Sequence, residues 1–174
     1  RGALQVSTVN LGGILVGDGQ PCAIIAELGI NHGGSVLTAE KLIDVAAYAG
    51  AQAVKLQKRS IEKFYSAEEM ARPLDRVFGH AAEQGWTTRG DYVRGREFGR
   101  QAYVDLNRYA QAKGLQFTAS CWDLQALDDV QATRADVVIL DRIEPGILPA
   151  YCTHGRTVCV GGCDEWCWLG DRTH

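Results

Sequence analysis

Proline and methionine are scarce in this chain, and long runs of one charge sign or of apolar residues are absent. Among 174 residues there are four prolines and one methionine, and the net charge is only −3. Without a charged run, the sequence does not resemble a protein that binds nucleic acid or an anionic membrane. No apolar run reaches the roughly 18 residues that a membrane span requires. We therefore expect neither a nucleic-acid partner nor a membrane partner.

The first residues also lack an initiator methionine and the pattern of a signal peptide, since the sequence begins at Arg1. This start favours an internally started fragment of a cytoplasmic protein. The hydrophobic share of 46% is enough for a packed core, and the length suits about one domain.

Six cysteines are present, and four of them fall within the last 23 residues. A secreted disulfide scaffold would be shorter and poorer in aliphatic residues, so we expect most of the thiols to be reduced. A zinc site is the alternative for the tail, although the spacing departs from the usual CxxC pairs. A truncated or frame-shifted tail is the simpler interpretation. The residues concerned are Cys152, His154, Cys159, Cys163, Cys167 and His174.

Short apolar runs alternate with segments of helical spacing along the chain, which is typical of successive βα steps and a parallel sheet. No glycine-rich phosphate loop follows the first of these strands, so we expect a barrel in preference to a doubly wound sheet. The predicted fold is α/β, a partial (β/α)8 TIM-type barrel of about five βα steps preceded by a short β-hairpin. We expect the hairpin over 4–16, strands over 22–27, 53–57, 115–120, 136–140 and 157–160, helices over 35–49, 100–113, 124–132 and 147–153, and a mouth loop with little regular structure over 58–99.

Polar residues gather where the first predicted strand ends. Glu27 closes that strand, and a glycine-rich turn with Asn31 and His32 follows it. A carboxylate, an amide and an imidazole so close together suit a polyhydroxylated substrate. The alternative is that the glycines only permit a turn, that Asn31 caps it, and that His32 is a surface residue.

The next two strands add four more candidate residues. Lys55 and Gln57 point to the same side of their strand because side chains alternate. A lysine in an apolar strand implies a nearby carboxylate or bound anion, unless the strand end is frayed. Ser120 and Asp123 stand at the end of the third strand, where they suit either a phosphate site or an ordinary helix cap. In a barrel, Glu27, Lys55, Gln57 and Ser120 should converge at one end of the sheet.

Together these segments resemble the sialic acid synthase family, which comprises N-acetylneuraminate synthases and their pseudaminic and legionaminic relatives. The resemblance covers roughly residues 9–130. It is carried mainly by the AELGINHGG segment that ends at Gly34, the AVKLQK segment that ends at Lys58, and the ASCWD segment that ends at Asp123.

The resemblance implies a complete (β/α)8 barrel in which phosphoenolpyruvate condenses with an N-acetylated hexosamine such as N-acetylmannosamine. The product is a nine-carbon 2-keto sugar acid, and phosphate is released. It also implies a divalent metal (Mn²⁺ or Mg²⁺), a homodimer and a small C-terminal antifreeze-like domain. Glu27, Lys55 and Gln57 would be catalytic, the first and last on the sugar side and Lys55 in the phosphoenolpyruvate pocket. Asn31, His32, Ser120 and Asp123 would bind substrate, with Ser120 in the phosphate loop.

The chain departs from that family beyond its third βα step. The segment 136–144 has no lysine-containing strand that ends in serine, and strands six to eight and the metal-binding histidines are missing. We therefore expect residues 1–160 to be the N-terminal part of a synthase-like barrel, 161–174 to be a divergent or truncated tail, and the isolated chain to be inactive. Two alternatives stay open: a non-catalytic half-barrel that binds or scaffolds, and a Schiff-base aldolase that uses Lys55.

Overall fold

The computed structural model describes residues 8–75, 80–133, 137–140, 157–161 and 166–169. The chain begins with a hairpin in which β1 (Val9–Leu11) pairs antiparallel with β2 (Ile14–Val16). The turn between them places Gly13 at φ +97°, and its N–H donates to Asn10 Oδ1 over 2.6 Å. This confirms the predicted hairpin, with shorter strands.

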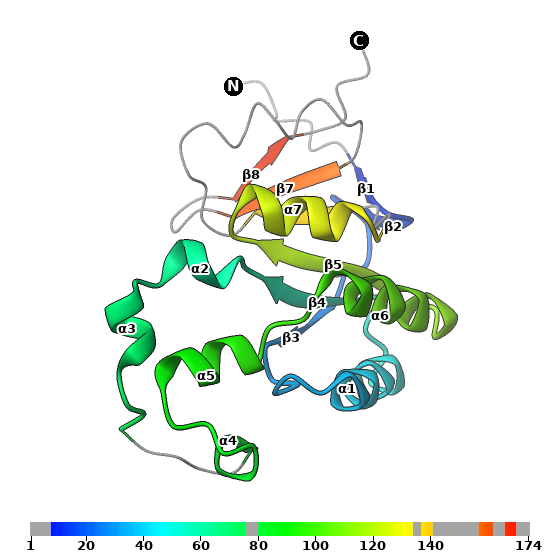
Figure 1. Cartoon of the computed structure of the whole chain (residues 1–174). Helices are drawn as coiled ribbons and strands as arrows, with labels where there is room; N and C mark the ends of the chain where they lie inside the picture. The colour runs from blue at the N-terminus through cyan, green and yellow to red at the C-terminus, as the bar shows by residue number, and fades with distance from the viewer. Residues whose placement is uncertain (1–7, 76–79, 134–136, 141–156, 162–165, 170–174) are drawn as a thin grey trace.

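A six-stranded sheet follows, in the order β3-β4-β5-β6-β7-β8 within the described ranges (Figure 1). The five strands β3 to β7 run parallel, which confirms the parallel sheet expected from the βα pattern. The strand β8 runs antiparallel to β7 and lies in the segment 161–174, where no strand was expected. Their bounds are Ile25–Gly29 (β3), Ala53–Lys58 (β4), Gln116–Cys121 (β5), Val137–Leu140 (β6), Thr157–Gly161 (β7) and Trp166–Leu169 (β8).

In the described part of the chain, three longer helices connect and cover the strands, as the apolar spacing predicted. They are α1 (Val36–Tyr48), α6 (Arg100–Ala112) and α7 (Leu124–Gln131). The Ser35 hydroxyl caps α1 by accepting from the Thr38 N–H over 3.2 Å, and Gly50 and Gly114 adopt positive φ after α1 and α6. The helix expected over 147–153 lies outside the described residues.

The three helices lie side by side on one face of the sheet, because α6 contacts both α1 and α7 (Figure 1). Apolar side chains fill the space between helices and strands. Leu56, Leu106 and Phe117 are almost fully buried there, and the Tyr103 ring meets the Phe117 ring edge to face with centroids 6.3 Å apart. Burying each such side chain stabilises the fold by about 1.5–3 kcal/mol.

The expectation of a loop with little regular structure over 58–99 is wrong. The described part of this range contains four short helices, and two of them begin with a capping box, formed by Ser66 with Glu69 and by Thr88 with Asp91. Helices of four to seven residues show no sustained apolar period, so the sequence pattern did not reveal them. They are α2 (Ile61–Phe64), α3 (Ala67–Ala71), α4 (His80–Glu83) and α5 (Arg89–Gly95).

A second, small apolar cluster holds part of this helical segment together. It contains Ile61 of α2, Met70 of α3 and Val93 of α5, all of them buried. The segment between β4 and α6 is therefore packed structure in its described part. No helix among the described residues is long and apolar enough to cross a membrane.

Candidate functional site

Three neighbouring strands bring four polar side chains together at their carboxyl ends. In the sheet register, Glu27 of β3 lies beside Lys55 of β4, and Gln57 lies beside Ser120 of β5. Lys55 Nζ forms an ion pair with Glu27 Oε2 and donates a hydrogen bond to Ser120 Oγ over 3.1 Å. We call Glu27, Lys55, Gln57 and Ser120 the strand-end cluster. Their convergence confirms the geometric prediction made from the strand pattern.

Gly29 explains how the Gln57 side chain reaches this cluster. The residue has φ +53° at a register irregularity of β3, directly after Glu27 and Leu28. A β-carbon at Gly29 would lie 3.4 Å from Glu27 Oε1 and 3.9 Å from Gln57 Nε2. The carboxylate and the amide therefore lie over the same point of the backbone, and glycine leaves room for both.

The residues of the strand-end cluster differ in how much of each side chain is exposed to solvent. Ser120 is fully buried, the Lys55 side chain is 19% exposed, and the Glu27 side chain is 47% exposed. The cluster therefore offers one partly buried ammonium beside a carboxylate that solvent can reach. An ammonium with a hydroxyl can bind an anion, and a carboxylate with an amide can accept and donate hydrogen bonds to sugar hydroxyls.

Asn31 and His32 lie in the turn after β3, and the structure places them differently. Asn31 is exposed, whereas His32 is only 2% exposed and stacks on Phe98 with ring centroids 4.0 Å apart. The alternative that His32 is a surface residue is therefore wrong. Burial, assisted by the nearby Arg96 charge, lowers the pKa of His32 to about 4.

The hydrogen bonds of His32 fix its neutral form. Its Nδ1 accepts from the Gly34 N–H over 3.1 Å, so the ring proton resides on Nε2. That Nε2 atom is buried without a hydrogen-bond partner among the described residues. His32 thus accepts a hydrogen bond within its own turn and stacks on Phe98, and neither contact joins it to Lys55.

Asp123 acts as a helix cap in this structure. Its Oδ1 accepts from the Ala126 N–H over 3.0 Å at the start of α7, and the Ser60 N–H and hydroxyl each donate to the carboxylate over 2.7 Å. Burial acts to raise the pKa of Asp123, but the hydrogen bonds from Ser60 and Ala126 and the charge of Lys63 hold it below its ordinary value. Asp123 therefore links the start of α2 to the start of α7. Of the two residues at the end of the third strand, Asp123 is the one that caps α7.

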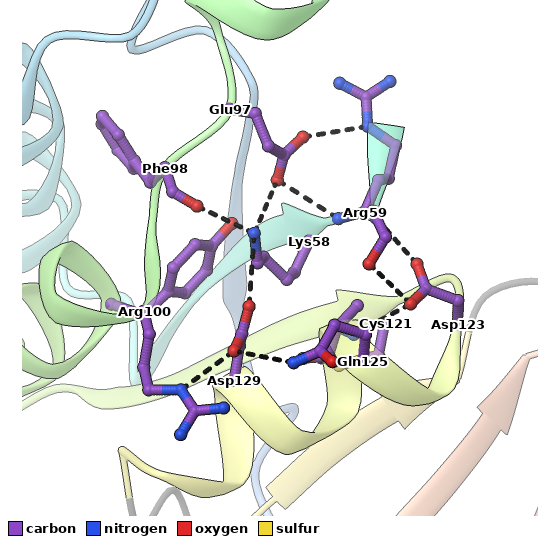
Figure 2. Close-up of polar contacts among 12 residues, drawn as sticks. Lys58, Arg59, Glu97, Phe98, Arg100, Cys121, Asp123, Gln125 and Asp129 are labelled. Atoms are coloured by element: carbon purple, nitrogen blue, oxygen red, sulfur yellow. Dashed lines mark hydrogen bonds and ion pairs between the residues drawn. The ribbon is translucent and has the colours of Figure 1, made fainter. Parts of the chain in front are cut away.

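A buried ionic network lies on the opposite side of β4, and it was not predicted from the sequence. Lys58 Nζ donates to the Phe98 carbonyl over 2.8 Å and lies 3.5 Å from Glu97 Oε1 and 3.6 Å from Asp129 Oδ2 (Figure 2). The Arg59 guanidinium also pairs with Glu97, at 3.2 Å. We call Lys58, Arg59, Glu97 and Asp129 the Lys58 network.

The alternation of side chains along β4 could have predicted this network from the sequence. Lys58 falls on the same side of the strand as Val54 and Leu56, which are fully buried. A lysine at the end of a buried apolar stripe requires a carboxylate partner. Tyr103 adds a further tie, since its hydroxyl donates to the Gln57 carbonyl over 2.5 Å. The network and Tyr103 thus hold the strand end from which Gln57 projects.

The described residues do not form a metal centre of their own. Among them, no group of three or more His, Cys, Asp or Glu side chains could hold a metal ion. Four of the cysteines considered for zinc lie where side chains are not described. Of the two described ones, Cys22 is exposed and Cys121 is buried, and both are free thiols.

The chain matches a known family and several characterised relatives. The model of the NeuB family matches residues 42–139, which is 98 of 174 residues and more than half of the chain. Human N-acetylneuraminate-9-phosphate synthase is 36% identical over 114 residues, covering 65% of this chain and 30% of that protein. The spore coat polysaccharide biosynthesis protein SpsE of Bacillus subtilis is 31% identical over 134 residues, covering 77% of this chain and 34% of that protein.

A solved structure with the same arrangement is the N-acetylneuraminic acid synthetase of Leptospira borgpetersenii in complex with citrate. It superimposes with a TM-score of 0.70 at 28% identity and covers 89% of this chain and 49% of that chain. This chain therefore spans about a third of the curated relatives that it matches and about half of that structural neighbour.

Proposed function

We propose a function from the premise that this chain belongs to the NeuB family. The protein that carries this segment condenses phosphoenolpyruvate with an N-acetylated hexosamine, such as N-acetylmannosamine, in carbohydrate biosynthesis. The relatives named above are a synthase of N-acetylneuraminate 9-phosphate, a synthetase of N-acetylneuraminic acid and a protein of spore coat polysaccharide biosynthesis. Since the chain spans about a third of the curated relatives, it supplies only part of the complete active site.

The observation that carries the proposal is the strand-end cluster. In it, Lys55 binds a charged group of phosphoenolpyruvate, and the Ser120 hydroxyl donates a hydrogen bond to the same group. Glu27 and Gln57 take the sugar side, where the carboxylate accepts from hydroxyls and the amide can both donate and accept. This arrangement holds the two reactants next to each other, which lowers the entropic part of the barrier.

The reaction forms one carbon–carbon bond and one carbon–oxygen bond, the second from water, and it breaks the carbon–oxygen bond to phosphate. The two protons of the water end on the former aldehyde oxygen and on the released phosphate. The methylene carbon of phosphoenolpyruvate attacks the aldehyde carbon of the open-chain sugar, and water adds to the resulting cation. The tetrahedral intermediate then loses phosphate to give the 2-keto acid. The residues of this chain contribute binding and orientation at both ends of the new bond.

A divalent metal, Mn²⁺ or Mg²⁺, belongs to the proposal as a family expectation, in which it polarises the aldehyde oxygen. The residues described here do not fit such an ion, because they contain no group of three or more possible ligands.

The barrel is also part of the proposal. Sequential parallel strands with their long helices on one face are typical of a (β/α)8 barrel, whereas a doubly wound sheet has helices on both faces. Three further parallel strands between β7 and β3 would close such a barrel, and β8, which pairs antiparallel with β7, departs from that pattern. A homodimer, a cytoplasmic location and a boundary near residue 160 complete the proposal.

The contacts of Lys55 weigh against the Schiff-base alternative. An ammonium held against the Glu27 carboxylate has no free lone pair with which to attack a carbonyl carbon. Borohydride trapping with pyruvate tests this directly, and we expect no covalent adduct at Lys55.

Binding titrations test the proposed roles with the 174-residue chain. We expect Lys55→Met to weaken phosphoenolpyruvate binding at least about tenfold, since it removes a charge-assisted contact. Gln57→Leu should weaken N-acetylmannosamine binding and leave phosphoenolpyruvate binding unchanged. Lys113→Met is the matched control, because Lys113 pairs with Asp44 on the helical side. Equal phosphoenolpyruvate affinities in all three variants and the parent would contradict the proposal. From the chain alone we expect no phosphate release, with or without Mn²⁺.

A further inference from the structure

The ammonium that would bind an anion already has a charged partner in the structure. Lys55 Nζ is paired with Glu27 Oε2 and also donates to Ser120 Oγ over 3.1 Å. The hydroxyl is neutral, so the only full charge against Lys55 in these contacts is the Glu27 carboxylate. An anion that approaches Lys55 must therefore share the ammonium with Glu27 or displace it.

The Glu27 side chain can give up this contact without leaving the site. It is 47% exposed, so water can solvate a carboxylate that has lost its partner. Its other oxygen, Oε1, lies on the side of Gly29, where the Gln57 amide also lies. A released Glu27 carboxylate thus lies near the Gln57 amide, which can bind hydroxyl groups.

We propose that the Glu27–Lys55 ion pair couples two ligands: an anion on Lys55 releases Glu27 to accept hydrogen bonds from a polyhydroxylated ligand. The inference rests on the proposed function, because it takes Lys55 as the anion site and Glu27 as the sugar site. Glu27 weakens anion binding in two ways, since it competes for the ammonium and repels the incoming charge. Coupling of this kind is reciprocal, so the sugar also strengthens anion binding.

The size of the coupling follows from the exposure of the pair. Ion pairs that solvent can reach are screened, and their loss changes an equilibrium by a small factor. Repulsion between Glu27 and a doubly charged anion adds to this factor. We expect removal of the Glu27 charge to tighten phosphate binding about three- to tenfold.

The test is a titration of the 174-residue chain with inorganic phosphate at constant ionic strength. Glu27→Gln keeps the shape of the side chain and removes its charge, and we expect tighter phosphate binding in this variant. Lys55→Met should bind phosphate more weakly than the parent chain. Glu68→Gln is the matched control, since it neutralises a glutamate in an exposed ion pair on α3 and should change nothing. Glu27→Ala, with circular dichroism to verify folding, is a second variant and should also bind more tightly.

The outcomes separate this inference from the proposed function. If Lys55→Met weakens phosphate binding but neither Glu27 variant tightens it, the coupling is refuted and the assignment of Lys55 as the anion site is supported. If Lys55→Met binds phosphate and phosphoenolpyruvate as the parent does, the proposed function falls, and the coupling falls with it. If the parent chain does not bind phosphate, the coupling predicts that the Glu27→Gln chain does bind it. If neither chain binds phosphate, the coupling is refuted.

A second titration measures the reciprocal effect. Saturating phosphate should raise the affinity of the parent chain for N-acetylmannosamine about three- to tenfold, by the same linkage. The Glu27→Gln chain should show no such increase. An equal increase in both chains would contradict a role of the ion pair.

Discussion

Replacing Lys58 by methionine perturbs the buried ionic network without removing the apolar stem of the side chain. The variant loses the 2.8 Å hydrogen bond to the Phe98 carbonyl and the cation between Glu97 and Asp129. Breaking a buried ion pair typically costs about 3–5 kcal/mol. Here each carboxylate keeps a second cation, because Arg59 pairs with Glu97 and Arg100 pairs with Asp129. We therefore expect Lys58→Met to lower the free energy of unfolding by about 2–4 kcal/mol.

The pH dependence of this destabilisation identifies its cause. Burial raises the pKa of Glu97 above its ordinary value of 4.5, although Lys58 and Arg59 act to lower it. A raised folded-state pKa means that the stability linked to Glu97 is fully present below pH 4.5 and is lost as pH rises through the folded-state value. Removing Lys58 raises that pKa further, so the difference between variant and parent should be largest at neutral pH and smaller near pH 4.

Urea denaturation of both chains at pH 7 and pH 4 measures these differences. Lys113→Met serves as the control, since its ion pair with Asp44 is well exposed and its loss should leave the midpoint nearly unchanged. A Lys58→Met chain as stable as the parent at pH 7 would refute the account of the network. So would a loss of stability that is the same at both pH values, because the charge of Glu97 would then have no part in it.

Three further predictions concern the turn after β3 and the α7 cap, and Gly50 after α1 serves as a comparison for the first of them. Gly34→Ala should lower the free energy of unfolding by at least about 3 kcal/mol, because a β-carbon there would lie 1.8 Å from the Gly95 carbonyl oxygen at φ +87°. In the same denaturation assay Gly50→Ala, at φ +81° with no atom within 4 Å, should cost only about 1 kcal/mol. The pKa of His32 is lowered in the folded state, so the unfolded chain takes up a proton first as pH falls from 6.5 towards 4. This should lower the free energy of unfolding by about 2 kcal/mol. A pH series of urea denaturation measures this loss, and a His32→Gln chain should lack it. Asp123→Ala should lower the free energy of unfolding by about 2–4 kcal/mol, since it removes the α7 cap and takes the acceptor from the buried Ala126 N–H and the partly buried Ser60 N–H. Thermal or urea unfolding measures this loss, and a neutral result would show that the cap contributes little.

Alternation along β4 explains why much of the candidate site was predictable. A strand places Lys55 and Gln57 on one face whatever surrounds it, and parallel neighbours bring Glu27 and Ser120 to the same edge. The same rule assigns Lys58 to the buried face. Its partner Glu97 lies 39 residues further along the chain, and only the folded structure shows that the two meet.

The segment between β4 and α6 was mispredicted for a different physical reason. Its short helices are stabilised locally by capping boxes at Ser66 and Thr88 and by a small apolar cluster that includes Met70. Neither source produces the repeated apolar spacing that reveals a longer helix such as α1. His32 was ambiguous for a similar reason, since its burial depends on stacking against Phe98 from a distant part of the chain.

The central claim is that the strand-end cluster binds phosphoenolpyruvate, and a crystal structure of the chain with this ligand tests it most directly. The account predicts a phosphate or carboxylate oxygen of the ligand within hydrogen-bond distance of both Lys55 Nζ and Ser120 Oγ. It also predicts that Glu27 has moved away from Lys55. Phosphoenolpyruvate bound elsewhere, with the Glu27–Lys55 ion pair intact, would contradict the account.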